Sequence, residues 1–316
     1  MLPKIVTVTF SPCIDKSTAI KKLCPDKKLL CSAPKLEPGG GGINVARAIK
    51  KLGGIATAVF PSGGYTGKYF NHLLEAENIP AIIIATQNET RENIIVLDEE
   101  SNAQYRFGMP GTALTEAEWK NCLQAVEEME DVSFIIASGS LPPGVPHDVY
   151  AMLAKISKDK RAKFIVDTSG EPLKKAVEQG VYLLKPNLGE LSFLAGKNDL
   201  QINEAEAAAK LIIDKGMCEV IVISMGENGA MLVTKDLQVL IKPPAVIRKS
   251  TVGAGDSMVA GIVHFLHKGK NILEAVNYGV ACGTAATMNS GTELCNVKDV
   301  ERLFETINFN ERKFLF

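Results

Sequence analysis

Short runs rich in Val, Ile and Phe recur along the chain, and each ends in small or polar residues. These runs are IVTVTF from Ile5, TAVFPS from Thr57, FIIASGS from Phe134, FIVDTS from Phe164, YLLKPN from Tyr182 and VIVISMG from Val220. Helical patterns follow most of them, and this alternation is typical of strands buried on both faces of a parallel sheet. We therefore expect an α/β fold with a doubly wound, mainly parallel sheet. Ligands bind beyond the carboxyl ends of such strands, so the residues that close each run are site candidates.

Two segments, at about 15–37 and 91–111, lack an attached helix. The first carries several lysines among apolar residues, and the second has the pattern of a β-hairpin with one polar face. Strands without covering helices, coming from distant parts of the chain, can pair into a small antiparallel sheet that projects from the main domain. A surface hairpin plus an irregular loop is an equally good interpretation of the same pattern.

The charge balance limits the classes of partner. Lys and Arg number 35 and Asp and Glu number 36, which gives a net charge of -1. No long-range field then favours nucleic acid or an anionic membrane, and an anionic ligand must be held by local groups. The N-terminus has no secretory pattern and no window approaches about 18 consecutive apolar residues, so we expect a cytoplasmic protein.

The cysteines and histidines do not form metal or disulfide patterns. The seven cysteines are an odd number and include no C-x-x-C pair, so we expect reduced thiols. His264 and His267 lie three residues apart in an apolar helical pattern, without a further ligand nearby in the sequence. We interpret this pair as packing and surface residues rather than a metal site.

Several familiar nucleotide and hydrolase motifs are missing. No G-x-x-x-x-G-K-[ST] run is present, and the nearest G-x-G-x-x-G frames end in Asn44 and Met258. H-E-x-x-H and G-x-S-x-G are also absent. These absences argue against a P-loop enzyme and against a dinucleotide oxidoreductase.

The segment STVGAGDSMVAG carries the strongest chemical signal. Gly253, Ala254 and Gly255 lead directly into a helical pattern, so their N–H groups and the helix dipole are expected to form an anion hole. Asp256 lies in the first turn. A carboxylate beside an anion hole suits phosphoryl transfer, because it takes the proton from the attacking hydroxyl. The plain alternative is that Asp256 only caps the helix.

A second glycine-rich segment is EPGGGGINVARAI. Gly39 to Gly42, which include Gly40 and Gly41, precede Asn44 and a helical pattern. Four glycines allow the backbone to approach a ligand, and the Asn44 amide can donate to and accept from hydroxyls. We expect a turn there that contacts substrate.

Two further strand ends carry polar groups. KPNLGE contains Lys185, Asn187 and Glu190, of which the Asn and the Glu could hold Mg²⁺ through water. SMGENGA supplies a turn that can accommodate phosphate, with Ser224, Gly226 and Gly229. On neighbouring strand ends, these groups outline a nucleotide pocket that runs toward Gly253.

Taken in order, these segments resemble the PfkB, or ribokinase-like, sugar kinases. The Gly39–Asn44 run, SGSLPPG, DTSGE, KPNLGE, SMGENGA and STVGAGDS follow that family's order and spacing from about Ile5 to about Phe304. The resemblance is closest to the ATP-dependent 6-phosphofructokinases of the PfkB type. It implies a Rossmann-like domain with a small β-sheet lid, and a homodimer formed through paired lids.

The resemblance also implies roles for individual residues. Asp256 would be the catalytic base. The remaining assignments fall into groups: Asp15, Asn44 and Ser140 for sugar hydroxyls; Lys28, Arg91 and Arg106 for the sugar phosphate; Lys185, Asn187, Ser224, Gly226, Gly229 and Asn289 near the nucleotide; and Ser250, Val252, Ala286, Asn289 and Gly291 for a monovalent cation such as K⁺.

The implied reaction is transfer of the ATP γ-phosphoryl group, with Mg²⁺, to the C1 hydroxyl of fructose 6-phosphate. Tagatose 6-phosphate, or fructose 1-phosphate phosphorylated at C6, would use the same mechanism and stay open as acceptors. A regulator that binds these ligands without turnover is an alternative of another class, against which the intact Asp256 argues.

Overall fold

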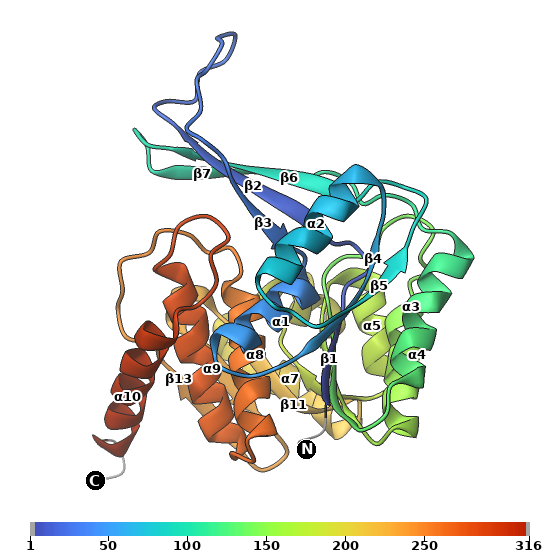
Figure 1. Ribbon diagram of the computed structural model, residues 1–316. Helices are drawn as coiled ribbons and strands as arrows, with labels where there is room; N and C mark the ends of the chain where they lie inside the picture. Colours follow the sequence, from blue (N-terminus) through green and yellow to red (C-terminus); the bar gives the residue numbers. More distant parts are fainter. Residues whose placement is uncertain (1–3, 314–316) are drawn as a thin grey trace.

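The computed structural model describes residues 4–313, which form a large sheet between two layers of helices, with a small sheet above it (Figure 1). The large sheet has the order β13-β12-β11-β10-β9-β8-β1-β4-β5. Its strands are β1 (Lys4–Val8), β4 (Thr57–Ser62), β5 (Ala81–Ala85), β8 (Val132–Ser138), β9 (Lys163–Asp167), β10 (Val181–Leu184), β11 (Cys218–Ser224), β12 (Ala230–Val233) and β13 (Gln238–Ile241).

The expected mainly parallel sheet is confirmed. All pairs from β5 to β11 are parallel, and only β12 and β13 run antiparallel, at one edge. All six runs singled out in the sequence form strands of this sheet, whereas β5, β12 and β13 were not expected. Because the parallel strands all point the same way, the residues that follow β1, β8, β9, β10 and β11 meet at one edge of the sheet.

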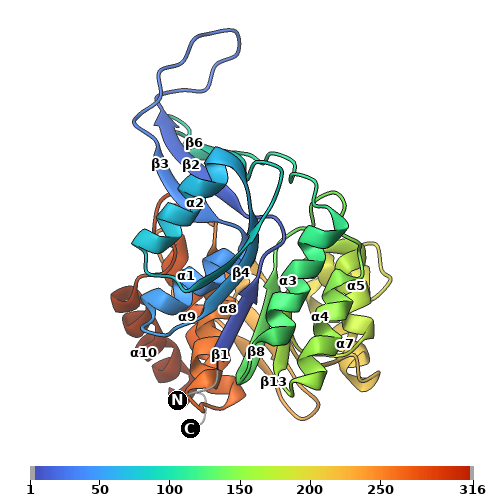
Figure 2. The ribbon, with the colours of Figure 1, turned by 45° about the vertical axis from the view of Figure 1, so that its right-hand side comes forward.

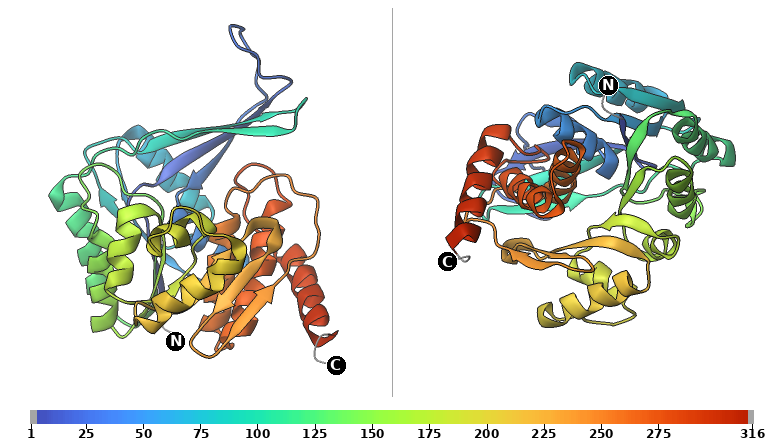
Figure 3. Two further views of the ribbon diagram at one scale, coloured as in Figure 1. Left: turned by 180° about the vertical axis from the view of Figure 1, so that it is seen from behind. Right: turned by 90° about the horizontal axis from the view of Figure 1, so that it is seen from below.

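Helices cover both faces of the sheet, and each face has its own apolar core (Figures 2 and 3). One layer consists of α1 (Gly41–Lys51), α2 (Gly64–Ala76), α8 (Ala254–His267), α9 (Ile272–Thr287) and α10 (Val297–Lys313). The other consists of α3 (Glu116–Glu128), α4 (Val149–Asp159), α5 (Gly170–Glu178), α6 (Leu188–Leu194) and α7 (Ile202–Asp214). Within residues 4–313, no helix is long and apolar enough to cross a membrane.

The small sheet, here called the lid sheet, forms from the two helix-free segments. It contains β2 (Cys13–Ile20), β3 (Lys35–Gly39), β6 (Arg91–Asp98) and β7 (Ala103–Phe107), in the order β3-β2-β6-β7. The expectation of a wholly antiparallel sheet was wrong, because the central pair β2–β6 is parallel. Both strands run outward from the body, so only the hairpin partners β3 and β7 return antiparallel to them. The lid sheet lies over the edge where the strand ends meet (Figure 1).

Candidate active site

The first turn of α8 forms the floor of the candidate site. Gly253 caps the helix with φ 71°, a left-handed conformation that glycine adopts without strain. A Cβ on Gly255 would lie 3.2 Å from Lys185 Nζ, so the ammonium group sits against the start of the helix. The first N–H groups of a helix have no intrahelical acceptor. Backbone N–H groups and one lysine therefore converge on the position predicted to be an anion hole.

Asp256 points toward α1 instead of capping its own helix. Its Oδ2 accepts a hydrogen bond of 3.0 Å from Asn44 Nδ2, and no side chain caps α8. The helix-cap alternative is therefore wrong. Burial raises the pKa of the Asp256 carboxyl to about 7, with a further contribution from the nearby Asp167 carboxylate. A carboxylate that titrates near neutral pH is well matched to general base catalysis.

Asp167, at the end of β9, is a site residue that the sequence interpretation did not assign. Its Oδ1 lies 3.3 Å from Lys185 Nζ. Burial alone would lower the pKa of Lys185, but the carboxylates of Asp167, Glu190 and Asp256 hold it above its usual value. Asp167 closes one of the six strand runs, so the rule that strand ends carry the site could have identified it.

A cavity of about 470 Å³ adjoins the first turn of α8 and is large enough for a small ligand. Its walls include Ser224, Gly226, Gly229, Pro243, Pro244, Val246, Arg248, Thr251, Gly255, Met258, Gly283 and Thr284. The turn predicted from SMGENGA therefore lines the cavity. Three other residues predicted near the nucleotide do not line this cavity: Lys185, Asn187 and Asn289. The Asn289 side chain instead donates to the carbonyl of Leu294.

Asn187 and Glu190 form a capping box at the start of α6. Asn187 Oδ1 accepts from the N–H of Glu190, and Glu190 Oε2 accepts from the N–H of Asn187. Burial and the Asp167 carboxylate raise the pKa of Glu190, and its second oxygen has no hydrogen bond recorded among the described residues. The Glu190 and Asp167 carboxylates therefore lie near each other in a partly buried site. Carboxylate oxygens are ligands that suit Mg²⁺. Residues 4–313 contain no cluster of three or more His, Cys, Asp or Glu side chains that could hold a metal ion.

The glycine run is partly turn and partly helix. Gly40 has φ 110° and precedes α1, which begins at Gly41, so Asn44 lies in the first turn of a helix and not beyond a four-glycine turn. A Cβ on Gly41 would come within 2.1 Å of Ser138 Oγ at the end of β8. Glycine is required there because α1 packs directly on the strand ends. Ser140 follows β8 and is exposed.

The lid-segment residues predicted to contact the sugar differ in their positions and in their hydrogen-bond partners. Asp15 is buried on the lid face that looks toward the body, and Arg91 donates to the carbonyls of Met109 and Ser11. Arg106 donates to Thr251 Oγ1, over a distance of 2.8 Å, and to Gln104. Lys28 lies apart from the other predicted sugar contacts of this chain. It lies on the exposed loop between β2 and β3, which projects away from the body (Figure 1).

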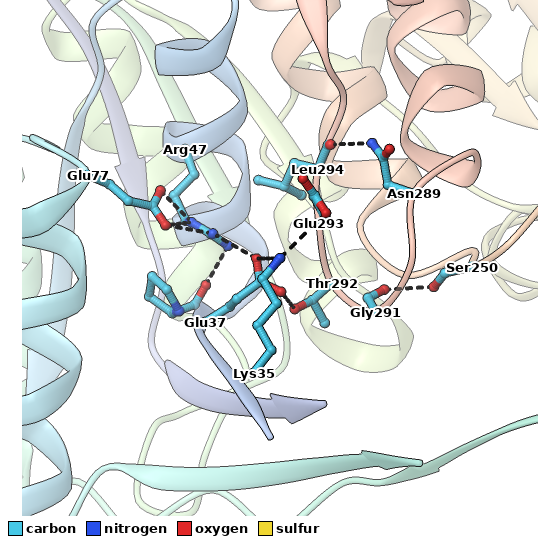
Figure 4. Close-up of polar contacts among 11 residues, drawn as sticks. Lys35, Glu37, Arg47, Glu77, Ser250, Asn289, Gly291, Thr292, Glu293 and Leu294 are labelled. Carbon is cyan, nitrogen blue, oxygen red and sulfur yellow. Dashed lines mark hydrogen bonds and ion pairs between the residues drawn. The ribbon is translucent and has the colours of Figure 1, made fainter. Parts of the chain in front are cut away.

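Three of the predicted cation residues lie in the segments just before α8 and just after α9: Ser250, Asn289 and Gly291 (Figure 4). Ser250 Oγ donates to the carbonyl of Gly291 and accepts from the N–H of Val252, and the N–H of Asn289 donates to the carbonyl of Ala286. Gly291 has φ 64° and turns the chain there. Backbone carbonyl oxygens are ligands that suit K⁺.

A buried ion-pair network connects this loop to the lid sheet (Figure 4). Arg47 on α1 donates to the Glu77 carboxylate at 2.7–3.0 Å and to the carbonyl of Pro38, and its Nη2 lies 3.4 Å from Glu37 on β3. Glu37 Oε2 accepts a hydrogen bond from Thr292 Oγ1 at 2.8 Å. The sequence interpretation gave no role to these residues.

The chain is similar to known proteins along nearly its whole length. The chain is 42% identical to the ATP-dependent 6-phosphofructokinase isozyme 2 of Escherichia coli, over 95% of this chain and 98% of the relative. It is similar to the solved phosphofructokinase-2 of E. coli in complex with potassium (TM-score 0.93, 42% identity, 97% of this chain and 99% of the other). It is also similar to the complex with fructose-6-phosphate (TM-score 0.92, 40% identity, 97% and 99%).

Residues 8–299 match the pfkB family carbohydrate kinases. This match covers the lid sheet, the large sheet except for most of β1, and every strand-end motif described above. The chain therefore belongs to the pfkB family of carbohydrate kinases.

Proposed function

We propose that this chain is an ATP-dependent 6-phosphofructokinase that converts fructose 6-phosphate to fructose 1,6-bisphosphate. One observation carries the proposal. The Asp256 carboxylate, with its pKa raised by burial to about 7, lies in the first turn of α8, and Gly255 of the same turn lines a cavity of about 470 Å³. The similarity to E. coli phosphofructokinase-2 supports fructose 6-phosphate as the acceptor.

In the reaction the C1 hydroxyl oxygen attacks the γ-phosphorus and its proton passes to Asp256. The bond between the γ-phosphorus and the β,γ-bridging oxygen breaks, and ADP leaves. The N–H groups at residues 253–255 and the Lys185 ammonium stabilise the charge on the transferring group. The Asn44 amide holds the Asp256 carboxylate in place.

The sugar would bind beneath the lid sheet. Its hydroxyls would lie near Asp15, Gly40, Gly41, Asn44 and Ser140. The phosphate would bind Arg91 and Arg106, whose present contacts within the chain are neutral oxygens. Exchanging neutral oxygens for a dianion strengthens each hydrogen bond.

The nucleotide would occupy the cavity lined by Ser224, Gly226 and Gly229, with Lys185 and Asn187 near its phosphates. Mg²⁺ would be held through water near Glu190 and would neutralise charge on the β- and γ-phosphates. K⁺ would bind the loops that contain Ser250, Val252, Ala286, Asn289 and Gly291.

The test is a panel of acceptors. Initial rates with fructose 6-phosphate, tagatose 6-phosphate and fructose 1-phosphate are compared at saturating MgATP, and the product is identified by ³¹P NMR. We expect the highest kcat/KM with fructose 6-phosphate and a product with phosphates on C1 and C6. A higher kcat/KM with another acceptor would contradict fructose 6-phosphate as the substrate. Nucleotide binding without turnover on any acceptor would refute the proposed kinase activity.

We also propose that residues 1–316 act as one kinase domain that forms a homodimer through the lid sheets. Tyr105 (39% exposed) and Phe107 (47%) lie on β7, and Leu30 (87%) lies on the projecting loop. Apolar surface on a small projecting sheet commonly marks an interface. Lys28 would then contact the sugar phosphate in the partner's site.

Phe107→Asp is expected to convert the dimer to monomers and to raise the KM for fructose 6-phosphate. A buried, unpaired carboxylate costs several kcal/mol, so the dimer dissociation constant should rise by about 100-fold or more. Sedimentation velocity and initial rates measure both effects. The matched control is Leu211→Asp on α7, an exposed leucine outside the lid sheet. Fully active monomers would refute the scheme.

A further inference from the structure

The face of the lid sheet that looks toward the body holds an asparagine directly opposite Asp15. Asn93 on β6 is the register partner of Asp15 on β2. Its Nδ2 donates to Asp15 Oδ1 at 3.0 Å, and its Oδ1 accepts from the N–H of Met109 at 3.1 Å. Both ends of the amide are therefore engaged, and a flipped amide would lose both bonds.

The two oxygens of Asp15 differ in their surroundings. Oδ1 accepts from Asn93 and from the Cys13 thiol, whereas Oδ2 points at Gly39, where a Cβ would lie only 2.3 Å away. No hydrogen bond to Oδ2 is recorded among the described residues. Asn93 thus fixes one oxygen and leaves the other directed toward the glycine run.

Asn93 also connects the two ends of the sugar site. The carbonyl of Met109, whose N–H it holds, accepts a 2.7 Å hydrogen bond from Arg91 Nη1. Asp15, proposed to bind a hydroxyl, and Arg91, proposed to bind the phosphate, are therefore joined through the Asn93 amide and the backbone N–H and carbonyl of Met109. Asn93 would thus position Asp15 and Arg91 without contacting the sugar itself.

We propose that Asn93 is a positioning residue of the sugar site, which holds Asp15 as an acceptor for a sugar hydroxyl and sets its spacing from Arg91. This inference rests on the proposed function, in which Asp15 contacts a hydroxyl of fructose 6-phosphate and Arg91 contacts its phosphate group.

The protonation of Asp15 makes the role testable. Burial raises the pKa of Asp15, and the hydrogen bond from Asn93 is the largest influence that opposes the rise. The other titratable or charged groups around the Asp15 carboxyl are Cys13 on β2, Glu37 on β3, Arg47 on α1, Arg91 on β6 and Asp256 on α8. These side chains keep their identity in a variant at position 93, but the Cys13 thiol loses a hydrogen bond there, because Asn93 Nδ2 also donates to Cys13 Sγ at 3.1 Å.

For two substitutions of similar size we expect opposite pH dependences of the affinity for fructose 6-phosphate. Asn93→Leu removes the donor, so the pKa of Asp15 rises further and sugar affinity falls as the pH is lowered. Asn93→Asp places two carboxyls together, and the pair shares one proton at low pH. When that proton is lost the two charges repel, so sugar affinity falls as the pH is raised.

The experiment measures binding of fructose 6-phosphate to each full-length variant by calorimetry from pH 5.5 to 8.5, together with kcat and both KM values. Asn93→Leu should weaken fructose 6-phosphate binding roughly 10- to 100-fold, the range for a hydrogen bond to a charged group. The KM for ATP should stay within about twofold of wild type, because Asn93 does not line the nucleotide cavity. Ser17→Ala is the matched control and should leave fructose 6-phosphate binding unchanged. Ser17 lies two residues after Asp15 on β2, and its buried hydroxyl has no hydrogen-bond partner among the described residues.

Opposite pH dependences in the two variants support the inference. Unchanged affinity, or an equal loss at every pH in both variants, overturns it, since a purely structural role would be independent of pH. If Asn93→Leu does not fold, the sign of the pH dependence in Asn93→Asp decides alone. A wild-type protein that binds no fructose 6-phosphate would overturn the proposed function itself, whereas normal wild-type binding with unaffected variants overturns only the role of Asn93.

Discussion

Asp256→Asn is expected to lower kcat by about 10²- to 10⁴-fold, because the variant lacks the group that takes the proton from the attacking hydroxyl. The amide oxygen can still accept the hydrogen bond from Asn44, so the fold around the site should remain. The nucleotide cavity borders Gly255 but not the Asp256 side chain. ATP binding, measured by calorimetry, should therefore stay close to wild type.

The control for this experiment is Asp214→Asn, which removes a carboxylate from the exposed end of α7 and should leave kcat unchanged. The wild-type pH profile gives a second check. The base must be ionised, and burial raises its pKa to about 7, so kcat/KM should fall about tenfold per unit as the pH drops below that value. Near-normal kcat in a folded Asp256→Asn variant would contradict the role assigned to Asp256.

Arg47→Met is expected to lower the free energy of unfolding by about 3–5 kcal/mol, the usual cost of removing one partner from a buried ion pair. The Arg47 side chain is 3% exposed and its three nitrogens donate to Glu77 and Pro38, next to the buried Glu37. Methionine fills much of the same volume, but among the described residues it leaves the Glu37 charge with Lys35 and Thr292 as its partners. Denaturant unfolding at constant m value measures the change.

Arg302→Met is the matched control, because Arg302 on α10 forms an exposed ion pair with Asp299. Exposed pairs contribute about 0–1 kcal/mol, so this variant should be close to wild type. Equal stability of the two variants would show that the network does not stabilise the fold. Arg47→Lys should lose part of the stability, since one ammonium group cannot reproduce the directions of the guanidinium hydrogen bonds.

Local signals in the sequence located most of the strand ends and both glycine-rich turns. Buried parallel strands need apolar side chains on both faces, so β1, β4, β8, β9, β10 and β11 stood out as apolar runs. The edge strands β12 and β13 are short and carry a weaker pattern, and neither was expected. The lid segments were found because they lacked helices, but their relative direction depends on where each leaves the body, which local pattern does not encode.

By itself the sequence determined the α/β class and singled out Gly253 to Gly255 as the candidate anion hole and Asp256 as the candidate base, because glycine at a helix start and a carboxylate in its first turn are local features. Only the tertiary structure decided which side chains meet. Asn44 and Asp256 are 212 residues apart, and Glu37 and Thr292 are 255 apart. The raised pKa of Asp256, the Asp167–Lys185 pair and the bond from Asn93 to Asp15 depend on burial and on distances between segments remote in the chain. Packing alone sets those quantities, since they arise from the desolvation and the contacts that the assembled sheet and its lid impose.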